Sequence, residues 1–481
     1  MPRLVIAKFG GSALGPDGIH IPRIVERIVE LKEKGATKVI AVFSAPLTVH
    51  DGRRRSLTDV VLEQGRAAES GAEPSLGVAR ETYSKILERH LGGSALEQCR
   101  SIVRENLARS QEALDEARAE KGEFAGEIRS RALAFSGEIL MSHIMKHILT
   151  YNGIQADAVR FEDWPIITDR NIESSNFLPE ESRRRMGPMA AMVEANEVVA
   201  IGGFIGRTTK GVTTTYERGG TDRTAVDLGI LFHRTYGTSI DFEKDSAVVS
   251  ADPKVVRENL SRVDQLSYNE ARLAGMFGMK ILDPVAIKEV VENGVDLPII
   301  ITNLNDPQTT TVIKRAPGVR GGAQQSTNPI KMVTGKSNCA IFRIETVAVQ
   351  KLLVSLEKDK RYSEFVILSP YTKDGIEFSR MLFLDADYVR RNEKYFMAFD
   401  PLATITYQRG VITLIGDEMW RVQQVASRTS ARVGEAGLNI LNIDAQEETS
   451  RIIIVIEDAA DNVKRAIASI HDEIVSINSI H

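Results

Sequence analysis

The sequence predicts an α/β protein built on a mainly parallel sheet, followed by two smaller α+β domains. Three observations predict this fold. A strand, a helix and a second strand follow one another between residues 4 and 44. A third apolar strand, residues 197–203, leads into a glycine-rich stretch and then a helix. After residue 329 the pattern changes to a strand–helix–strand–strand–helix–strand order that occurs twice, which is typical of small α+β domains.

The N-terminal part begins with a short apolar strand at residues 4–7 that ends in consecutive glycines. Residues 21–31 have apolar side chains at helical spacing, and residues 38–44 are again an apolar strand. This strand–helix–strand order is a βαβ unit of a parallel sheet. Residues 57–150 have a helical composition with few breakers, and residues 222–232 form a helix that follows two glycines.

The tail contains two units with the same order of elements. Strands are expected at 339–345, 364–369, 377–385 and 402–407 with helices at 347–358 and 388–397, then strands at 411–415, 439–444, 451–456 and 475–480 with helices at 422–437 and 462–474. A stretch rich in Gly, Pro, Gln, Ser and Thr precedes them and is expected to be a linker. The predicted division is 1–314, a linker at 315–329, 330–408 and 409–481.

Composition excludes several classes of protein. The 481 residues are 43% hydrophobic and 26% charged, which is ordinary for a soluble globular chain. The net charge of −4 argues against a surface that binds nucleic acid throughout. Two cysteines exclude a disulfide scaffold. Because no signal-peptide pattern or long apolar stretch is present, we expect a cytoplasmic location and no contact with a membrane.

The first candidate site lies at the end of the first strand, at Lys8, Gly10 and Gly11. Glycines let a backbone approach a ligand closely, and successive N–H groups can surround an anion. A lysine at the strand end adds a full positive charge to the same place. The alternative is a tight turn with a solvated lysine.

The second candidate site is the stretch 203–225, which is dense in Gly and Thr. It contains Arg218 and, at the start of a helix, Asp222. Asp222 could be only a helix cap and Arg218 a solvated loop residue. The density of small and hydroxyl residues nevertheless favours a ligand-binding loop.

Several motifs together resemble those of aspartate kinases, members of the amino-acid kinase fold family. They occur in one order: Lys8-Phe9-Gly10-Gly11-Ser12, Ser136-Gly137-Glu138, Ile167-Thr168-Asp169, Gly203-Phe204-Ile205-Gly206, residues 214–222, Ala251-Asp252-Pro253-Lys254 and residues 277–282. The resemblance implies a three-layer α/β/α sandwich around a mainly parallel sheet. The tail resembles, more weakly, the paired ACT regulatory domains of the same enzymes.

The resemblance implies transfer of the ATP γ-phosphoryl group to the side-chain carboxylate of L-aspartate. The product, 4-phospho-L-aspartate, is the entry to lysine, threonine and methionine synthesis. Lys8 would contact the transferring group, with backbone N–H groups of Gly10 and Gly11 and with Ser44 on the phosphate side. Asp222 would hold Lys8 in place. Mg²⁺ is implied with ATP, and no direct protein ligand for it is assigned.

The resemblance also assigns residues to the two substrates. For aspartate, Arg218 would pair with a carboxylate and Glu138 with the ammonium group, and the site would be lined by Phe204, Thr221 and Thr58. For the nucleotide, Lys254 and Lys280 would provide positive charge. The Thr-Asp pair that the family has near adenine and ribose is replaced here by Glu243 and Lys244, which leaves the nucleotide preference open.

The tail residues Asn439, Ile440 and Asn442 resemble the effector strand of an ACT domain. An amino-acid effector, lysine or threonine, and a homo-oligomer formed through these domains are therefore expected. Tail domains that serve oligomerisation alone are the alternative. Two other functions stay open for the whole chain, namely a related kinase acting on another acidic amino acid and a catalytically weak amino-acid sensor.

Overall fold

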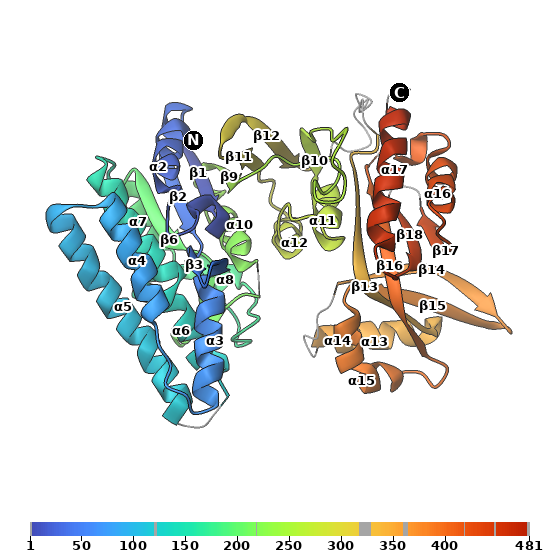
Figure 1. The fold of residues 1–481 in the computed structure, drawn as a ribbon, viewed down its shortest axis with the longest axis horizontal. Coiled ribbons are helices and arrows are strands. Elements are labelled where there is room, and N and C mark those ends of the chain that lie inside the picture. Colours follow the sequence, from blue (N-terminus) through green and yellow to red (C-terminus); the bar gives the residue numbers. More distant parts are fainter. Residues whose placement is uncertain are drawn as a thin grey trace. The chain divides into compact units, whose positions relative to one another are not determined.

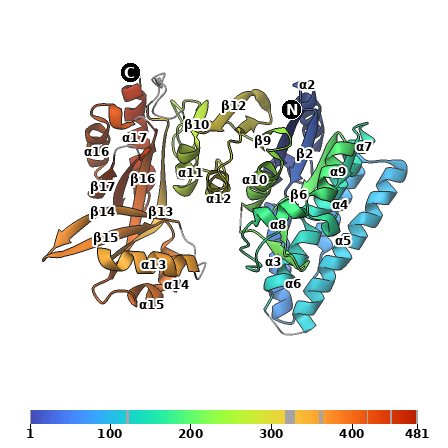
Figure 2. The same cartoon turned by 180° about the vertical axis from the view of Figure 1, so that it is seen from behind.

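The computed structural model describes residues 2–119, 123–217, 219–316, 329–358, 364–417, 419–446 and 449–478. The chain forms two compact units (Figures 1 and 2). The first unit comprises Met1–Ala247 and Val285–Lys314, and the second comprises Val248–Pro284 and Arg315–His481. Within the described part of the chain, no helix has the length and apolar character needed to cross a membrane.

The first unit contains a sheet whose strands follow the order β12-β11-β9-β1-β2-β6-β5. All neighbouring pairs are parallel except β11 with β12, so the mainly parallel sheet is confirmed. The strands are β1 Arg3–Phe9, β2 Lys38–Phe43, β5 Ala156–Ala158, β6 Val198–Gly202, β9 Gly237–Lys244, β11 Ile299–Asn303 and β12 Asp306–Lys314. Two hairpins accompany the sheet, β3 Leu47–His50 with β4 Arg53–Ser56 and β7 Ile205–Arg207 with β8 Thr213–Thr215.

Helices cover both faces of this sheet, which confirms the three-layer α/β/α arrangement (Figure 1). The helices of this unit are α1 Gly11–Leu14, α2 Ile21–Glu33, α3 Leu57–Glu69, α4 Gly77–His90, α5 Gly93–Ala119, α6 Gly126–Ser136, α7 Glu138–Tyr151, α8 Pro179–Arg184, α9 Gly187–Ala195, α10 Gly220–Phe232 and α12 Pro284–Glu292, with a 3-10 turn at Phe161–Asp163. Helices α2, α7, α9 and α10 are among those that contact the strands of the sheet directly. Ile24 of α2 and Met145 of α7 share a core with Val5 and Ala7 of β1. Because side chains alternate along a strand, Lys8 projects to the opposite face, where α10 lies.

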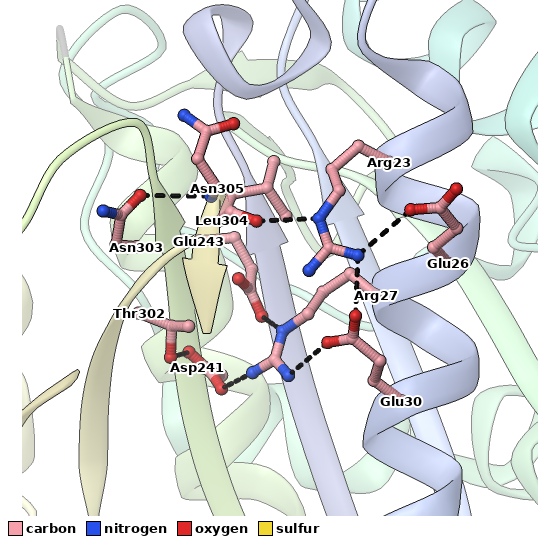
Figure 3. A network of polar contacts seen from close by, with 10 residues as sticks. All are labelled: Arg23, Glu26, Arg27, Glu30, Asp241, Glu243, Thr302, Asn303, Leu304 and Asn305. Atoms are coloured by element: carbon pink, nitrogen blue, oxygen red, sulfur yellow. Dashed lines mark hydrogen bonds and ion pairs between the residues drawn. The ribbon is translucent and has the colours of Figure 1, made fainter. Parts of the chain in front are cut away.

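A buried ion-pair network joins α2 to strand β9 (Figure 3). Nε of Arg27 lies 2.6 Å from Oε1 of Glu243, and its Nη2 lies 3.0 Å from Oδ2 of Asp241. The other oxygen of Asp241 accepts a hydrogen bond of 2.7 Å from Thr302 of β11. Burial and the neighbouring Asp241 raise the pKa of Glu243 to about 8, although Arg27 opposes this shift. One guanidinium therefore fixes the register between a helix and the end of a central strand.

Replacing Arg27 by Ala is expected to lower the free energy of unfolding by about 3–5 kcal/mol, because two carboxyl groups stay buried without their cation. Burial favours the protonated form of both carboxyl groups, so the folded state takes up protons more readily than the unfolded state. The loss should thus be greatest above pH 8 and should shrink as the pH falls. Urea denaturation at pH 9 and pH 6 measures it.

The control is Arg23→Ala, since the Arg23 side chain on the same helix is 24% exposed and pairs with the half-buried Glu30. Arg23→Ala should lower the free energy of unfolding by less than Arg27→Ala does, and its effect should depend less on pH. Equal losses for the two variants would contradict the assigned role of Arg27.

The second unit includes a segment from the middle of the sequence, with β10 Gln265–Ser267 and α11 Tyr268–Met276. Glu270, fully buried in α11, accepts a hydrogen bond of 2.7 Å from Lys331 Nζ and one of 2.8 Å from the backbone N–H of Asp417. Ser250 and His471 lie 2.8 Å apart in a second buried contact. These contacts explain why residues 248–284 fold with the tail.

The tail forms one antiparallel sheet with the order β14-β15-β13-β16-β18-β17. Its elements are β13 Met332–Glu345, α13 Thr346–Lys358, β14 Phe365–Lys373, β15 Ile376–Phe383, α14 Ala386–Arg391, α15 Glu393–Met397, β16 Thr404–Ile415, α16 Val425–Glu435, β17 Ile440–Ala445, β18 Arg451–Glu457 and α17 Asn462–Asn478, with a 3-10 turn at Met419–Arg421. Strands β13 and β16 each contact two apolar cores. Val333 of β13 and Ile412 of β16 belong to one core, while Phe342 of β13 belongs to the other, against which Ile405 of β16 packs.

Three details of the tail differ from expectation. The helix expected at 388–397 is interrupted at Asn392 and forms α14 and α15. The strands expected at 402–407 and 411–415 are one continuous strand, β16. The prediction of a last strand at 475–480 is wrong for the described residues, because helix α17 continues to Asn478. Buried Ile470, Ile474 and Ile477 recur at helical spacing and so hold this segment in a helix.

The predicted division at 314, 329 and 408 stays a prediction. Most of the expected linker 315–329 lies outside the described residues, which resume at residue 329. Strand β16 runs through the position between 408 and 409.

Candidate active site

The carboxyl ends of parallel strands β1, β2, β6 and β9 meet at one edge of the sheet in the first unit. In an open α/β sheet this edge is where ligands bind. The structure brings eight of the sequence-predicted site residues together there: Lys8, Gly10, Ser44, Glu138, Phe204, Thr221, Asp222 and Lys244. They come from strand ends, from the loops that follow, and from the first turns of α7 and α10.

Lys8 and Asp222 form an ion pair at the centre of this edge. Nζ of Lys8 lies 2.7 Å from Oδ1 of Asp222, and each side chain is 10% exposed. Asp222 lies in the first turn of α10, whose preceding residue Gly219 has a φ of 94°. A helix N-terminus carries partial positive charge, so it stabilises Asp222 and any further anion that binds nearby.

Two glycines keep room around this pair. A Cβ on Gly10 would lie 3.2 Å from Nζ of Lys8, which is tight enough to displace the ammonium group. A Cβ on Gly203 would overlap the side chain of Thr221. The absence of side chains at these positions therefore sets how closely the β1 and β6 loops approach α10.

Hydroxyl groups and backbone contacts hold the rest of the edge in place. Ser44 Oγ donates to Thr221 Oγ1 over 2.9 Å, which connects the end of β2 to α10. The backbone N–H of Phe204 donates to Thr224 Oγ1 over 3.0 Å, and Phe204 adopts a φ of 68°. The loops after β2 and β6 are thus both anchored on the first turns of α10.

Glu138 is a buried carboxyl group that retains an unused acceptor. It is 4% exposed, and within the described residues its Oε2 has no hydrogen-bond partner. Burial raises the pKa of Glu138 to about 7, while the backbone N–H groups of Glu138 and Ala45 favour the ionised form. Such a carboxylate is suited to a cationic group of a ligand.

The two substituted residues at the end of β9 lie on different faces of the sheet. Glu243 points toward α2 and pairs with Arg27, as described above (Figure 3). Lys244 points toward α10, and its Nζ lies 3.9 Å from Oδ2 of Asp222.

Other predicted residues are not brought to this edge by a described contact. Thr58 lies half-buried in the first turn of α3, where its backbone N–H donates to Ser56 Oγ. Arg218 lies outside the described residues. Lys254 and Lys280 belong to the second unit.

The predicted effector residues lie at strand β17, an edge strand of the tail sheet. Asn439 is exposed just before this strand, while Ile440 and Asn442 belong to it and are half-buried. Oδ1 of Asn442 is buried and has no hydrogen-bond partner among the described residues.

A second buried cluster, which the sequence does not predict, lies within and next to the glycine-rich stretch 203–225. Arg223 pairs with Glu289 at 2.6 Å, its guanidinium lies 4.0 Å from the ring centroid of Tyr216, and Tyr216 donates a hydrogen bond to the buried Asp227. Through the pair of Arg223 with Glu289, this cluster connects the first turns of α10 to helix α12. The signal in the sequence is Asp227, a charged residue within the otherwise apolar stretch 225–232.

The fold and this edge define a three-layer α/β protein with a cationic site at the carboxyl ends of its parallel strands. Residues 3–303 match the model of the amino acid kinase family, and the chain therefore belongs to that family.

Relatives and solved structures agree with this assignment. The chain is 22% identical to the aspartokinase of Schizosaccharomyces pombe over 99% of this chain and 94% of that protein. It is 25% identical to the chloroplastic bifunctional aspartokinase/homoserine dehydrogenase 2 of Arabidopsis thaliana over 71% of this chain, but it spans 35% of that longer protein. The crystal structure of E. coli aspartokinase III in complex with aspartate and ADP shares the fold, with a TM-score of 0.74, 17% identity and coverage of 98% of this chain and 99% of that one.

Proposed function

We propose that this protein is an aspartate kinase that transfers the γ-phosphoryl group of ATP to the side-chain carboxylate of L-aspartate. The observation that carries the proposal is the pairing of two kinds of group at one sheet edge. Lys8 with Asp222 offers a fixed positive charge for a phosphoryl group. Glu138 offers a buried, unused carboxylate oxygen for an ammonium group. The named activities of the relatives support the same reaction.

The reaction needs little proton transfer. A side-chain carboxylate with an ordinary pKa of about 3.9 is already ionised at neutral pH. The obstacle is repulsion between this carboxylate and the phosphates of ATP, together with the charge of the transferring group. Positioning and electrostatic stabilisation must therefore supply most of the catalysis. Lys8 would neutralise the transferring group, and Asp222 would act through Lys8 as a positioning residue.

The amino-acid substrate would be held by its charged groups. Glu138 would accept from the α-ammonium group, Arg218 would pair with a carboxylate, and Phe204, Thr221 and Thr58 would line the site. ATP would be held by Gly10, Gly11 and Ser44, with Glu243, Lys244, Lys254 and Lys280 as further candidates from the sequence. Glu243, already paired with Arg27, is the weakest of these.

Mg²⁺ fits this site as an ion held mainly by ATP. Within the described residues no three His, Cys, Asp or Glu side chains gather into a metal site. Mg²⁺ commonly binds through one or two carboxylates and substrate phosphates. Asp222 is the carboxylate that would face it, and the ion would neutralise phosphate charge when bound.

The tail would regulate or assemble the enzyme. Strand β17 is an edge strand, and its Leu441 and Ile443 are 41% and 42% exposed. An edge strand with exposed apolar side chains supports a homo-oligomer formed there. Asn439, Ile440 and Asn442 would lie beside a bound amino-acid effector, lysine or threonine. A cytoplasmic location is part of the same proposal.

The test is aspartate-dependent formation of ADP from ATP, repeated with glutamate as the acceptor and with lysine, threonine or methionine added. Turnover with aspartate, and not with glutamate, is the expected result. Turnover with glutamate alone would indicate a related amino-acid kinase. Binding of an amino acid without any turnover would indicate a sensor.

A further inference from the structure

Strand β9 ends in two residues of opposite charge whose side chains leave the sheet on opposite faces. Glu243 projects toward α2, where Arg27 neutralises it (Figure 3). Lys244 projects toward α10 and Asp222. Because successive strand residues alternate between faces, these two side chains point away from each other and have different partners. Of these two residues, Lys244 lies on the same face of the sheet as Lys8.

Asp222 therefore lies between two ammonium groups. Lys8 is 2.7 Å from Oδ1, and Lys244 is 3.9 Å from Oδ2. The three side chains carry a net charge of one positive unit, and the N-terminus of α10 adds a partial positive charge. The neighbouring Asp245 also attracts Lys244, but Asp245 is exposed and water screens its charge. The side chains of Lys8 and Lys244 are only 10% and 23% exposed, so water screens their repulsion poorly.

A bound anion would neutralise the excess positive charge of Lys8 and Lys244. A multiply charged group placed beside both lysines would stabilise both ammonium forms at once. An adenine or ribose, which carries no charge, would leave the repulsion in place.

We infer that Lys244 binds the phosphoryl group in transfer, together with Lys8, rather than the base or ribose of the nucleotide. This inference rests on the proposed function. In the step concerned, the γ-phosphorus forms a bond to an aspartate carboxylate oxygen while its bond to the β–γ bridging oxygen breaks. ADP leaves with that electron pair. Lys244 keeps its proton and stabilises negative charge on the phosphoryl oxygens throughout.

The experiment compares Lys244→Met, Lys244→Gln and Lys244→Arg with the matched control Lys210→Met, which removes an exposed lysine from the same unit. Two quantities are measured: kcat for aspartate-dependent ADP formation, and calorimetric affinities for ATP and AMP. Lys244→Met and Lys244→Gln should lower kcat by about 10²-fold or more, as expected for loss of one preorganised electrostatic contact. Both variants should weaken ATP binding relative to AMP binding, and Lys244→Arg should retain part of each property.

Equal weakening of ATP and AMP with an unchanged kcat would overturn the inference and place Lys244 at the base or ribose. Loss of activity in the control as well would also contradict it. If the wild-type protein does not phosphorylate aspartate, the proposed function fails. The ratio of ATP to AMP affinity still decides the role of Lys244 in that case, so the two failures are distinguishable.

Discussion

Replacing Lys8 by Ala is expected to lower kcat for aspartate phosphorylation by about 10³-fold while changing the affinity for ATP much less. Lys8 is held 2.7 Å from Asp222 in a largely buried site, so its charge is already in place before the reaction starts. A contact that strengthens as charge develops on the transferring group acts on the rate and not on ground-state binding. Steady-state kinetics of ADP release and calorimetry with ATP measure the two quantities.

Two further variants sharpen this experiment. Asp222→Asn should also lower kcat, because Lys8 would lose the partner that orients it. Lys210→Ala, at an exposed position in the same unit, should leave both quantities unchanged. An unchanged kcat for Lys8→Ala would remove Lys8 from the reaction and with it the central argument for phosphoryl transfer at this edge.

Replacing Glu138 by Gln is expected to raise the KM for aspartate about 10- to 100-fold, the range expected for losing a hydrogen bond to a charged group. The unpaired Oε2 is the acceptor that the substrate ammonium would use. Since the pKa of Glu138 is about 7, the wild-type KM should rise as the pH falls below 7 and the carboxylate becomes protonated. The variant should lack this dependence. Initial rates against aspartate between pH 5.5 and 8.5, a span of about 1.5 units to either side, would measure it.

The same variant should make the unliganded protein more stable at pH 8. A carboxyl group whose pKa is raised by folding destabilises the folded state above that pKa, and Gln removes this charge. Glu112→Gln, at an exposed position in the interior of α5, is the control and should alter neither KM nor the melting temperature. A KM that is independent of pH in the wild-type protein would show that Glu138 does not bind the ammonium group.

The sequence was sufficient for features that depend on local patterns. The apolar runs around Ala7 and Ala41 and the glycines after Lys8 identified a βαβ unit, and the structure has β1, α2 and β2 there. Motif order also brought Lys8 and Asp222 into one hypothesis, and the structure places them in an ion pair.

Features that depend on which face a side chain takes were harder to predict. Glu243 was assigned to the nucleotide because of its position in a motif, whereas the structure pairs it with Arg27 from a helix on the other side of the sheet. The pattern contained a clue, since Asp241 and Glu243 are two residues apart on a buried strand and require a buried cation. Only the packing of α2 shows that Arg27 is this cation.

Strand β16 has a consequence for how the tail can be divided. Ile405 and Tyr407 in its first half pack against the core of Phe342, and Ile412 and Leu414 in its second half belong to the other core. A chain break at residue 408 would therefore interrupt one continuous strand that contributes to both cores. Neither half of the tail is a module that recombination could exchange or deletion could remove alone, so the two are expected to be inherited, to fold and to melt as one piece.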